Sequence, residues 1–233
     1  LAAGCSLADS CPADRFADFV KAHPGHTVIS YVNTSAAVKA LTDVVVTSTN
    51  ARQIVESFPQ ETPIIFGPDR NLGSYINAVT GRQMLLWDGA CHVHEQFSVE
   101  KIVELKAAHP DAEVLAHPEC KGAVLKLADV VGSTATLLKH AVKSPCRRFI
   151  VATEAGILHE MRKQCPDKEF IPAPPNAGAC ACNECNFMRL NTMEKLYACL
   201  RDESPAIEVA PDIAARAVKP IERMLDISRK LGL

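Results

Sequence analysis

The chain has 233 residues, of which 48% are hydrophobic and 22% charged, a composition that excludes a disordered tail, a collagen-like repeat and a coiled coil. Lysine and arginine number 25 against 27 acidic residues, so the net charge is −2, and 5% of the residues are aromatic. We expect no nucleic-acid partner, because neither a basic field for phosphates nor many aromatic rings for stacking on bases are present. The apolar runs are too short to cross a bilayer, so no membrane partner is expected either. These features favour a small-molecule partner.

The predicted helices and strands alternate along the chain. In the first part, apolar spacing predicts a helix over 12–22, a strand over 27–32, a short helix over 35–41, and strands over 43–46 and 63–67. The second part predicts the same order, with helices over 97–108 and 122–127 and strands over 113–116, 129–131 and 149–153. Strands that alternate with helices at this spacing predict parallel sheets between helical layers. The predicted fold class is therefore α/β, with repeated three-layer αβα domains.

An internal repeat with an offset of 86 residues supports this division. Residues 23–49 and 109–135 share nine identities, where chance matching would give roughly two. The identical positions of the first copy are His23, Pro24, Val28, Ala37, Val38, Leu41, Asp43, Val44 and Val45. We therefore predict one repeat unit over 1–88, a second over 89–171, and a third segment over 172–233 that holds a cysteine loop and the C-terminal helices.

The third segment has a different character from the repeat. A loop is expected over 172–179, followed by CACNEC at 180–185 and then by an amphipathic helix and a final helix that extends from Ile213 to Ile227. Three methionines, Met188, Met193 and Met224, form a stripe that is expected to lie in the core. The charged side chains between Arg216 and Arg229 are expected to face solvent. Because the segment brings no repeat unit of its own, its helices are expected to pack on a third unit.

Ten cysteines point to metal chemistry rather than to a disulfide scaffold. A chain of this length can build a core without disulfides, and no signal peptide begins the sequence, so we expect a cytoplasmic location with reduced thiols. The repeat pairs Cys5 with Cys91, and a thiol from 180–185 would complete a three-thiolate site with one open metal position. Thiolates favour zinc, cuprous copper or an iron–sulfur cluster.

Other readings of the cysteines remain open. Cys182 and Cys185 form a single CxxC, which is also compatible with a redox pair, while a four-cysteine structural zinc would need a second CxxC. Cys120 is equally compatible with a site and with a core position. The cysteines without a repeat counterpart are expected to be buried and inert: Cys11, Cys146, Cys165 and Cys199.

Polar side chains follow the predicted strands where parallel sheets bind ligands. They are Tyr31, Asn33 and Ser48 in the first copy and His117, Glu119, Ser133 and Thr134 in the second. Ser48, Ser133 and Thr134 are alternatively helix N-caps. His94 becomes a candidate because it lies close to Cys91. The remaining single histidines are expected to be structural or surface residues: His23, His109, His140 and His159.

Taken together, several segments resemble the quinolinate synthase family, the iron–sulfur enzymes of bacterial NAD biosynthesis. The segments are AGCSLADSCP, YVNTSAAVKA, VVTS, FGPDRNLGSYI, GACHVHEQF, HPEC, VGST, CNECNFMRLNT and KPIERMLD. The resemblance covers nearly all 233 residues. It implies three similar αβα domains in a pseudo-threefold arrangement around one [4Fe–4S] cluster, so that one domain, which supplies a His and a Tyr to the site, would be missing from this sequence.

The resemblance also implies roles for individual residues. Cys5, Cys91 and Cys185 would bind the cluster, and its fourth iron would bind substrate. Glu119, His117 and Tyr31 would move protons. The substrate-contacting positions would be Tyr31, Asn33, Ser48, His94, His117, Glu119, Ser133 and Thr134.

The reaction implied is the condensation of iminoaspartate with dihydroxyacetone phosphate to quinolinate, with loss of phosphate and water. L-aspartate oxidase would be the source of iminoaspartate. Position 179 is Ala where some members carry the first cysteine of a CxxCxxC triplet, which leaves open a redox switch through Cys182, with Cys180 as an extra thiol.

Two alternatives to this function are retained. One is another three-cysteine iron–sulfur enzyme, a reductase of an allylic diphosphate, which would need a strongly cationic or His-rich pocket. The other is a non-catalytic metal-binding remnant. Iron content and colour after anaerobic reconstitution separate these readings, because a cluster absorbs visible light and zinc does not.

Overall fold

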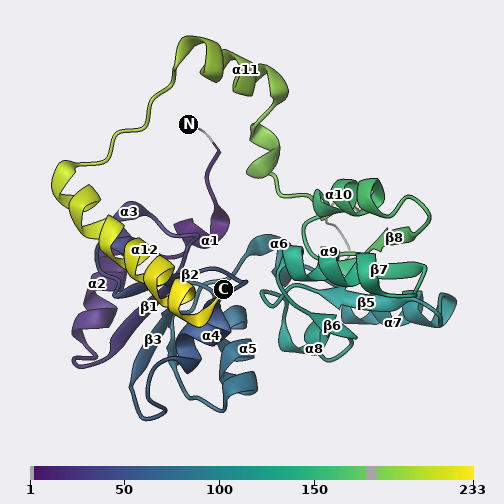
Figure 1. Cartoon of the computed structure of the whole chain (residues 1–233), viewed down its shortest axis with the longest axis horizontal. Helices are drawn as coiled ribbons and strands as arrows, with labels where there is room; N and C mark the ends of the chain where they lie inside the picture. The colour runs from purple at the N-terminus through teal and green to yellow at the C-terminus, as the bar shows by residue number, and fades with distance from the viewer. Residues whose placement is uncertain (1–2, 177–182) are drawn as a thin grey trace. The chain divides into compact units, whose positions relative to one another are not determined.

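The structure, a computed structural model, describes residues 3–176 and 183–233. It divides into two compact units: the described residues up to Gly89 together with Asn186–Leu233 form the first, and Ala90–Cys185 contains the second. Each unit holds a four-stranded parallel sheet flanked by helices (Figure 1). The predicted α/β class with αβα layers is thereby confirmed, with two such sheets in the described part. The predicted division at 88/89 and 171/172 follows the repeat rather than the packing, and it stays a prediction.

The sheet of the first unit has the order β2-β1-β3-β4. Its strands are β1 (Thr27–Tyr31), β2 (Val44–Val46), β3 (Ile64–Gly67) and β4 (Leu85–Leu86). Helices α2 (Ala13–Lys21) and α3 (Ala36–Lys39) cover one face, where Phe16 and Val38 pack with Ile65. On the opposite face Phe66 approaches α5 (Arg70–Thr80), which packs beside α4 (Ala51–Glu56). The strands are apolar on both sides because both faces are covered.

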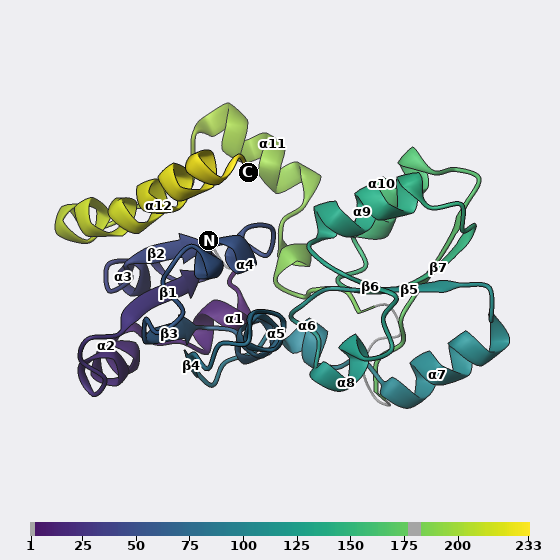
Figure 2. The ribbon, with the colours of Figure 1, turned by 60° about the horizontal axis from the view of Figure 1, so that its bottom comes forward.

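The C-terminal helix α12 (Pro211–Leu231) completes the first unit by packing along its edge strand β2 and along α3 (Figure 2). Asn50 Nδ2 donates to Ser228 Oγ (3.2 Å), and Arg216 Nη2 donates to the carbonyl of Ala40 (3.1 Å). An edge strand covered in this way offers no free backbone for pairing with another chain. The expected solvent-facing charges of this helix are confirmed, since Arg216 and Arg229 are exposed.

The expectation that the methionine stripe is core was wrong for two of its members. Met188, in a short 3-10 helix (Met188–Leu190), is 59% exposed, and Met193, at the start of α11 (Met193–Asp202), is 76% exposed, while Met224 is half-buried. Helical apolar spacing predicts a face, but the face is buried only where another surface meets it. Within the described ranges α11 buries none of its side chains.

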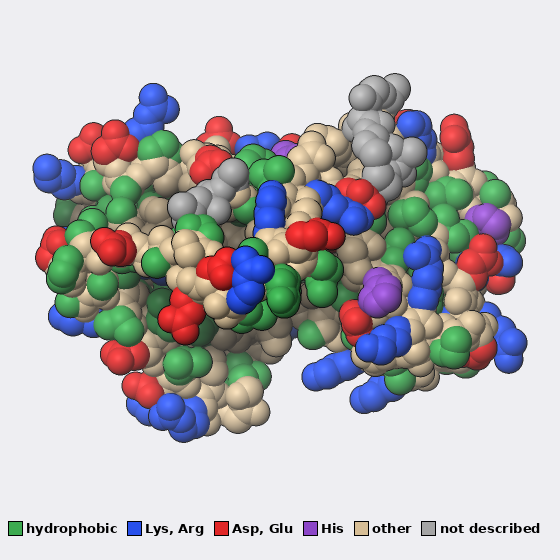
Figure 3. All heavy atoms as spheres, turned by 90° about the horizontal axis from the view of Figure 1, so that it is seen from above, with side chains coloured by type: hydrophobic (Ala, Val, Ile, Leu, Met, Phe, Trp, Pro, Cys, Tyr) green, Lys and Arg blue, Asp and Glu red, His purple; other side chains and the backbone are tan. Residues whose placement is uncertain are grey.

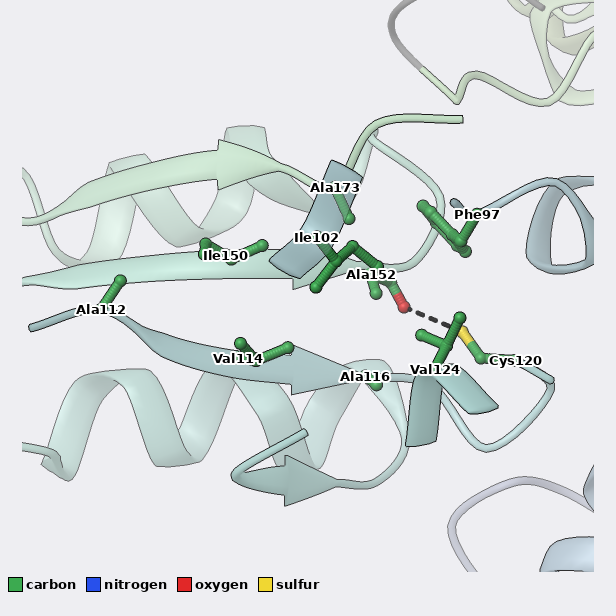
Figure 4. Close-up of a cluster of buried hydrophobic side chains, with 10 residues drawn as sticks. All are labelled: Phe97, Ile102, Ala112, Val114, Ala116, Cys120, Val124, Ile150, Ala152 and Ala173. Carbon is green, nitrogen blue, oxygen red and sulfur yellow. Dashed lines mark hydrogen bonds between the residues drawn. The ribbon is translucent and has the colours of Figure 1, made fainter. Parts of the chain in front are cut away.

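The sheet of the second unit has the matching order β6-β5-β7-β8. Its strands are β5 (Glu113–Ala116), β6 (Val130–Val131), β7 (Arg148–Ala152) and β8 (Glu169–Pro172). Val114 and Ile150 face α7 (Val99–Ala108) and α8 (Gly122–Leu125) in the cluster of Figure 4. Leu115 and Val151, one residue further along each strand, face α9 (Thr134–Lys143) and α10 (Ile157–Gln164). The alternation of side chains along a strand thus builds both covered faces.

The repeat identities have a structural explanation. Asp43 Oδ2 accepts the backbone N–H of Val28 (2.8 Å) and Asp129 Oδ2 accepts that of Val114 (2.7 Å), 86 residues later in each case. Each aspartate also donates its own N–H to the same residue's carbonyl, at 2.8 and 2.9 Å. We call these paired contacts the register clamps, because they join the start of β1 to β2 and the start of β5 to β6. They explain why both copies of the repeat have an aspartate at this position.

Three further features complete the description. The strands β4 and β8 were not among those predicted; both lie at sheet edges, and β4 has two residues. On the face shown in Figure 3, acidic and basic side chains are interspersed. Of the helices in the described part of the chain, none has the length and apolar character needed to span a membrane.

Candidate functional site

The predicted site residues of the first unit lie at its strand ends and at one helix start. Cys5 is the half-buried N-cap of α1 (Ser6–Asp9), Tyr31 is the buried last residue of β1, and Ser48 is half-buried just after β2. Asn33 is exposed in the loop after β1. Lys39 holds this loop, since its Nζ donates to the carbonyls of Val32 (2.7 Å) and Thr34 (2.6 Å), and burial lowers the pKa of its ammonium group.

In the second unit, three groups of different chemistry converge. Cys91, the N-cap of α6 (His92–Glu95), is the repeat partner of Cys5, which also caps a short helix. The Cys91 Sγ, a ring nitrogen of His94 and a carboxylate oxygen of Glu119 all lie within 4.8 Å of one another. His94 Nδ1 is 3.2 Å from Glu119 Oε2, and both side chains are less than a tenth exposed. A thiol, an imidazole and a carboxylate therefore meet in a buried position.

Two neighbours fix the orientation of this group. His94 Nε2 is hydrogen-bonded to Thr153 Oγ1 (3.1 Å), directly after β7, so Nδ1 is the nitrogen turned toward Glu119. His117 stacks on His94 with ring centroids 4.8 Å apart, and its Nδ1 lies 3.7 Å from Glu119 Oε1. The backbone N–H of Glu119 donates to His117 Nδ1 (3.4 Å), which assigns the proton of a neutral His117 to Nε2.

The pKa values of the two stacked histidines are shifted in opposite directions. Burial lowers the pKa of His94, but the neighbouring Cys91 and Glu119 side chains outweigh it and raise the pKa to about 10. Burial, assisted by the neighbouring charge of His94, lowers the pKa of His117 to about 4 although Glu119 acts in the other direction. Near neutral pH the site therefore holds a charged His94 beside a neutral His117, which gives it a hydrogen-bond donor and a proton acceptor within one stack.

The other predicted residues of the second unit are Ser133, Thr134 and Cys185. Ser133 is a buried N-cap of α9 whose Oγ accepts the N–H of Thr136 (3.2 Å), so its N-cap reading is observed, and Thr134 is exposed beside it. Cys185 is half-buried, and its backbone N–H donates to Glu154 Oε1 (3.1 Å) just beyond β7. Of the seven candidates in this unit, Cys91, His94, His117 and Glu119 form one contact group.

The remaining cysteines divide into core and surface positions. Cys120 belongs to the core cluster of Figure 4, where its S–H donates to the carbonyl of Ala152 (3.3 Å). Cys11 and Cys165 are buried as expected, and burial raises the pKa of Cys11 to about 12. Cys146 is half-buried, and the expectation of burial was wrong for Cys199, which is exposed on α11. The predicted redox positions Cys180 and Cys182 lie outside the described residues.

Sequence reasoning missed Thr153 and Glu154, which hold His94 and the Cys185 backbone. A signal for them existed, because both directly follow the third strand of the second copy, the position at which the other candidates were found. The strand predicted over 149–153 placed Thr153 inside the strand, whereas β7 ends at Ala152. The first copy has Pro68 and Asp69 at the corresponding strand end, and Asp69 accepts the N–H of Leu72 (2.7 Å) as the N-cap of α5. The two copies thus use this strand end differently.

The sequence is similar to known proteins over nearly its whole length. The protein-family model described as Quinolinate synthetase A protein matches residues 1–226. The protein named quinolinate synthase from Thermosynechococcus vestitus is 58% identical over 228 residues, which cover 98% of this chain and 72% of that protein. Those of Nostoc punctiforme and Chloroherpeton thalassium are 58% and 54% identical, over 98% of this chain and 70% and 71% of their own lengths.

Proposed function

The chain belongs to the quinolinate synthase family, and from this premise we propose that it forms quinolinate for NAD biosynthesis. The proposed reaction condenses iminoaspartate with dihydroxyacetone phosphate and releases phosphate and water. A cytoplasmic location would keep the thiols reduced, and an L-aspartate oxidase is the proposed source of iminoaspartate. The observation that carries the proposal is the buried contact group of Cys91, His94, His117 and Glu119 in a chain more than half identical to named quinolinate synthases.

The proposed cofactor is a [4Fe–4S] cluster with Cys5, Cys91 and Cys185 as its ligands. The donor chemistry fits, because iron–sulfur clusters are held by thiolates and all three side chains are half-buried thiols. The hydrogen bond from the Cys185 backbone to Glu154 holds one of these thiols in place. Bound by three thiolates, the cluster would supply one iron as a Lewis acid for a substrate oxygen.

The chain's own residues supply proton transfer and orientation in this proposal. Glu119 accepts or donates a proton because it is buried and faces both histidines. His117, neutral at physiological pH with its proton on Nε2, donates a hydrogen bond and accepts a proton at its other nitrogen when contacts rearrange. Charged His94 attracts a substrate carboxylate. Tyr31 is the third proposed proton carrier.

Substrate anions are assigned to the helix starts and the strand-end loops. The Ser133 Oγ accepts the backbone N–H of Thr136 and is also hydrogen-bonded to Thr136 Oγ1 (3.0 Å). When the Thr136 hydroxyl is the donor of that bond, the Ser133 hydrogen can reach a carboxylate or phosphate oxygen beside Thr134. Asn33 and Ser48 are assigned the same task in the first unit, where the Lys39 contacts hold the Asn33 loop in place. The polar residues at both sheets' strand ends thus divide into proton carriers and anion holders.

Anaerobic reconstitution of the chain with iron and sulfide tests this proposal. We expect about four irons per chain and broad visible absorption, and quinolinate formation from both substrates once the further domain that the family resemblance implies is joined to the chain. One zinc per chain without colour would refute the cluster. A coloured chain that binds quinolinate but gives no product would assign cluster binding to this chain while removing its catalytic role.

A further inference from the structure

The contact group in the second unit has the composition of a zinc site in addition to its proposed catalytic role. We propose that Cys91, His94 and Glu119 bind one Zn²⁺ when the chain holds no cluster, and that this zinc excludes the cluster by occupying Cys91. The inference about zinc rests on the geometry of the second unit alone. The exclusion of the cluster additionally rests on the proposed role of Cys91 as a cluster ligand.

The spacing of the ligand atoms supports zinc. Bonds of about 2.0–2.2 Å to nitrogen and oxygen place these two atoms roughly 3.4 Å apart around a tetrahedral zinc. His94 Nδ1 and Glu119 Oε2 are 3.2 Å apart. His94 Nδ1 is buried, and among the described residues it forms no hydrogen bond with good alignment, although the Glu119 carboxylate lies beside it. The observed separation thus matches that of two atoms bound to one zinc ion.

The thiol completes the set with a small adjustment. All three ligand atoms lie within 4.8 Å of one another, whereas a Zn–S bond of about 2.3 Å requires roughly 3.6 Å between sulfur and either other atom. Rotation about the Cα–Cβ bond of Cys91 is the movement that can bring its sulfur to this distance. A thiolate and a carboxylate cancel the charge of Zn²⁺, so that the buried site is neutral overall and avoids the cost of an uncompensated buried charge.

The surroundings also match those of a zinc-binding histidine. Such a histidine donates its second ring N–H to an oxygen, which fixes its tautomer and orientation. Thr153 Oγ1 occupies this position at 3.1 Å from His94 Nε2 and is itself buried. The three ligands leave the fourth zinc position for water, as in other three-ligand sites.

The test measures metal binding by the full chain, purified without metal or cluster under anaerobic conditions. Equilibrium dialysis should give one tightly bound zinc per chain, and Co²⁺ in its place should show a thiolate-to-cobalt charge-transfer band. Cys91→Ser and Glu119→Gln should each weaken zinc binding by at least ~100-fold. Thr153→Val should weaken it by ~10–100-fold, and Thr153→Ser should restore it, since loss of an outer partner typically has this effect.

The matched control is Cys5→Ser, the repeat partner of Cys91. It should leave zinc binding unchanged while it prevents cluster formation, whereas Glu119→Gln should lose zinc and keep the cluster. If Cys5→Ser or Cys185→Ser weakens zinc binding while Glu119→Gln does not, zinc occupies the thiolates and the proposal is overturned. A chain that binds no zinc overturns it as well.

A final measurement addresses exclusion of the cluster. Zinc-loaded chain should take up iron and sulfide more slowly than metal-free chain, and Glu119→Gln should remove this difference. Equal rates in the original chain would overturn the exclusion. Because zinc binding is measured without a cluster, failure of the proposed synthase function would leave the zinc result readable.

Discussion

At the residue scale, His94 and His117 show how position sets the chemistry of one side-chain type. Their rings stack, yet only His94 faces both Cys91 and the nearer carboxylate oxygen of Glu119. The raised pKa of His94 contributes stability that is fully present below the ordinary histidine pKa of 6.5 and is lost as pH rises toward 10. The lowered pKa of His117 works in the opposite direction, since the unfolded chain binds the proton more readily.

The first prediction concerns the acid side of the stability profile. His117 should contribute stability above pH 6.5 that is lost as pH falls toward its folded pKa of about 4. Between pH 7 and pH 5 this amounts to about 2 kcal/mol of unfolding free energy. His117→Asn should therefore lose less stability over this interval than the original chain does, as measured by urea unfolding of the metal-free protein. Identical losses in both proteins would contradict the assigned cause.

Glu119 carries the second prediction. Glu119→Gln keeps the volume of the side chain and removes its capacity to accept a proton, so quinolinate formation should fall by on the order of 10²-fold or more. The variant should retain the cluster absorption and bind a dicarboxylate analogue. Turnover is to be measured anaerobically in the reconstituted full-length enzyme. Near-normal turnover would remove Glu119 from proton transfer, and loss of the cluster would give it a structural role instead.

At the scale of elements, the register clamps connect sequence identity to strand pairing. Asp43 and Asp129 each close one end of a parallel strand pair by accepting one N–H with the side chain and donating another from the backbone. Parallel neighbours have no hairpin turn between them, so their alignment needs such a local constraint. The clamps fix Ile29 opposite Val44 and Leu115 opposite Val130.

The third prediction tests one clamp. Asp129→Ala should lower the unfolding free energy by about 1–3 kcal/mol, because it leaves the N–H of Val114 without its side-chain acceptor. Asp129→Asn should recover part of this loss, since its amide oxygen also accepts. Asp167→Ala, at an exposed position of the same unit, serves as the control and should change stability little. Equal stability of Asp129→Ala and the control would show that the clamp adds nothing.

Elements that are determined by the local sequence pattern could be predicted, whereas those that depend on tertiary contacts could not. Central strands such as 113–116 were predicted because buried parallel strands are continuous apolar runs, and the repeat supplied the order of helices and strands. The edge strand β4 was missed because a strand of two residues is too short to show an alternating pattern of apolar and polar side chains. The burial of Met188 and Met193 was wrong because periodicity indicates a face and not its partner.

The site was predictable to the extent that it follows strand ends. His117 and Glu119 were candidates for that reason, and the repeat brought Cys91 into consideration. The approach of Thr153 to His94 depends on how α6 faces the end of β7, which no spacing in the sequence encodes. The opposite pKa directions of the two histidines likewise depend on three-dimensional neighbours.

At the scale of the whole molecule, the fourth prediction tests the three ligands proposed for the cluster. Cys5→Ser, Cys91→Ser and Cys185→Ser should each abolish the cluster, because a site with three thiolates cannot lose one and hold iron tightly. Cys146→Ser and Cys165→Ser should leave iron at about four atoms per chain. Iron and sulfide analysis after reconstitution provides the measurement. Full iron content in Cys91→Ser would contradict the ligand assignment.

The return of α12 to β2 has a consequence for the order in which a ribosome releases the chain. The first unit combines residues that precede Ala90 with Asn186–Leu233, while Ala90–Cys185 is contiguous. Domains usually complete their folding in the order of synthesis. Here the whole second unit leaves the ribosome before α12, the helix that covers β2, has been translated. The nascent chain therefore completes the sheet of the second unit while β2 of the first unit is still uncovered, and translation of α12 ends that exposure.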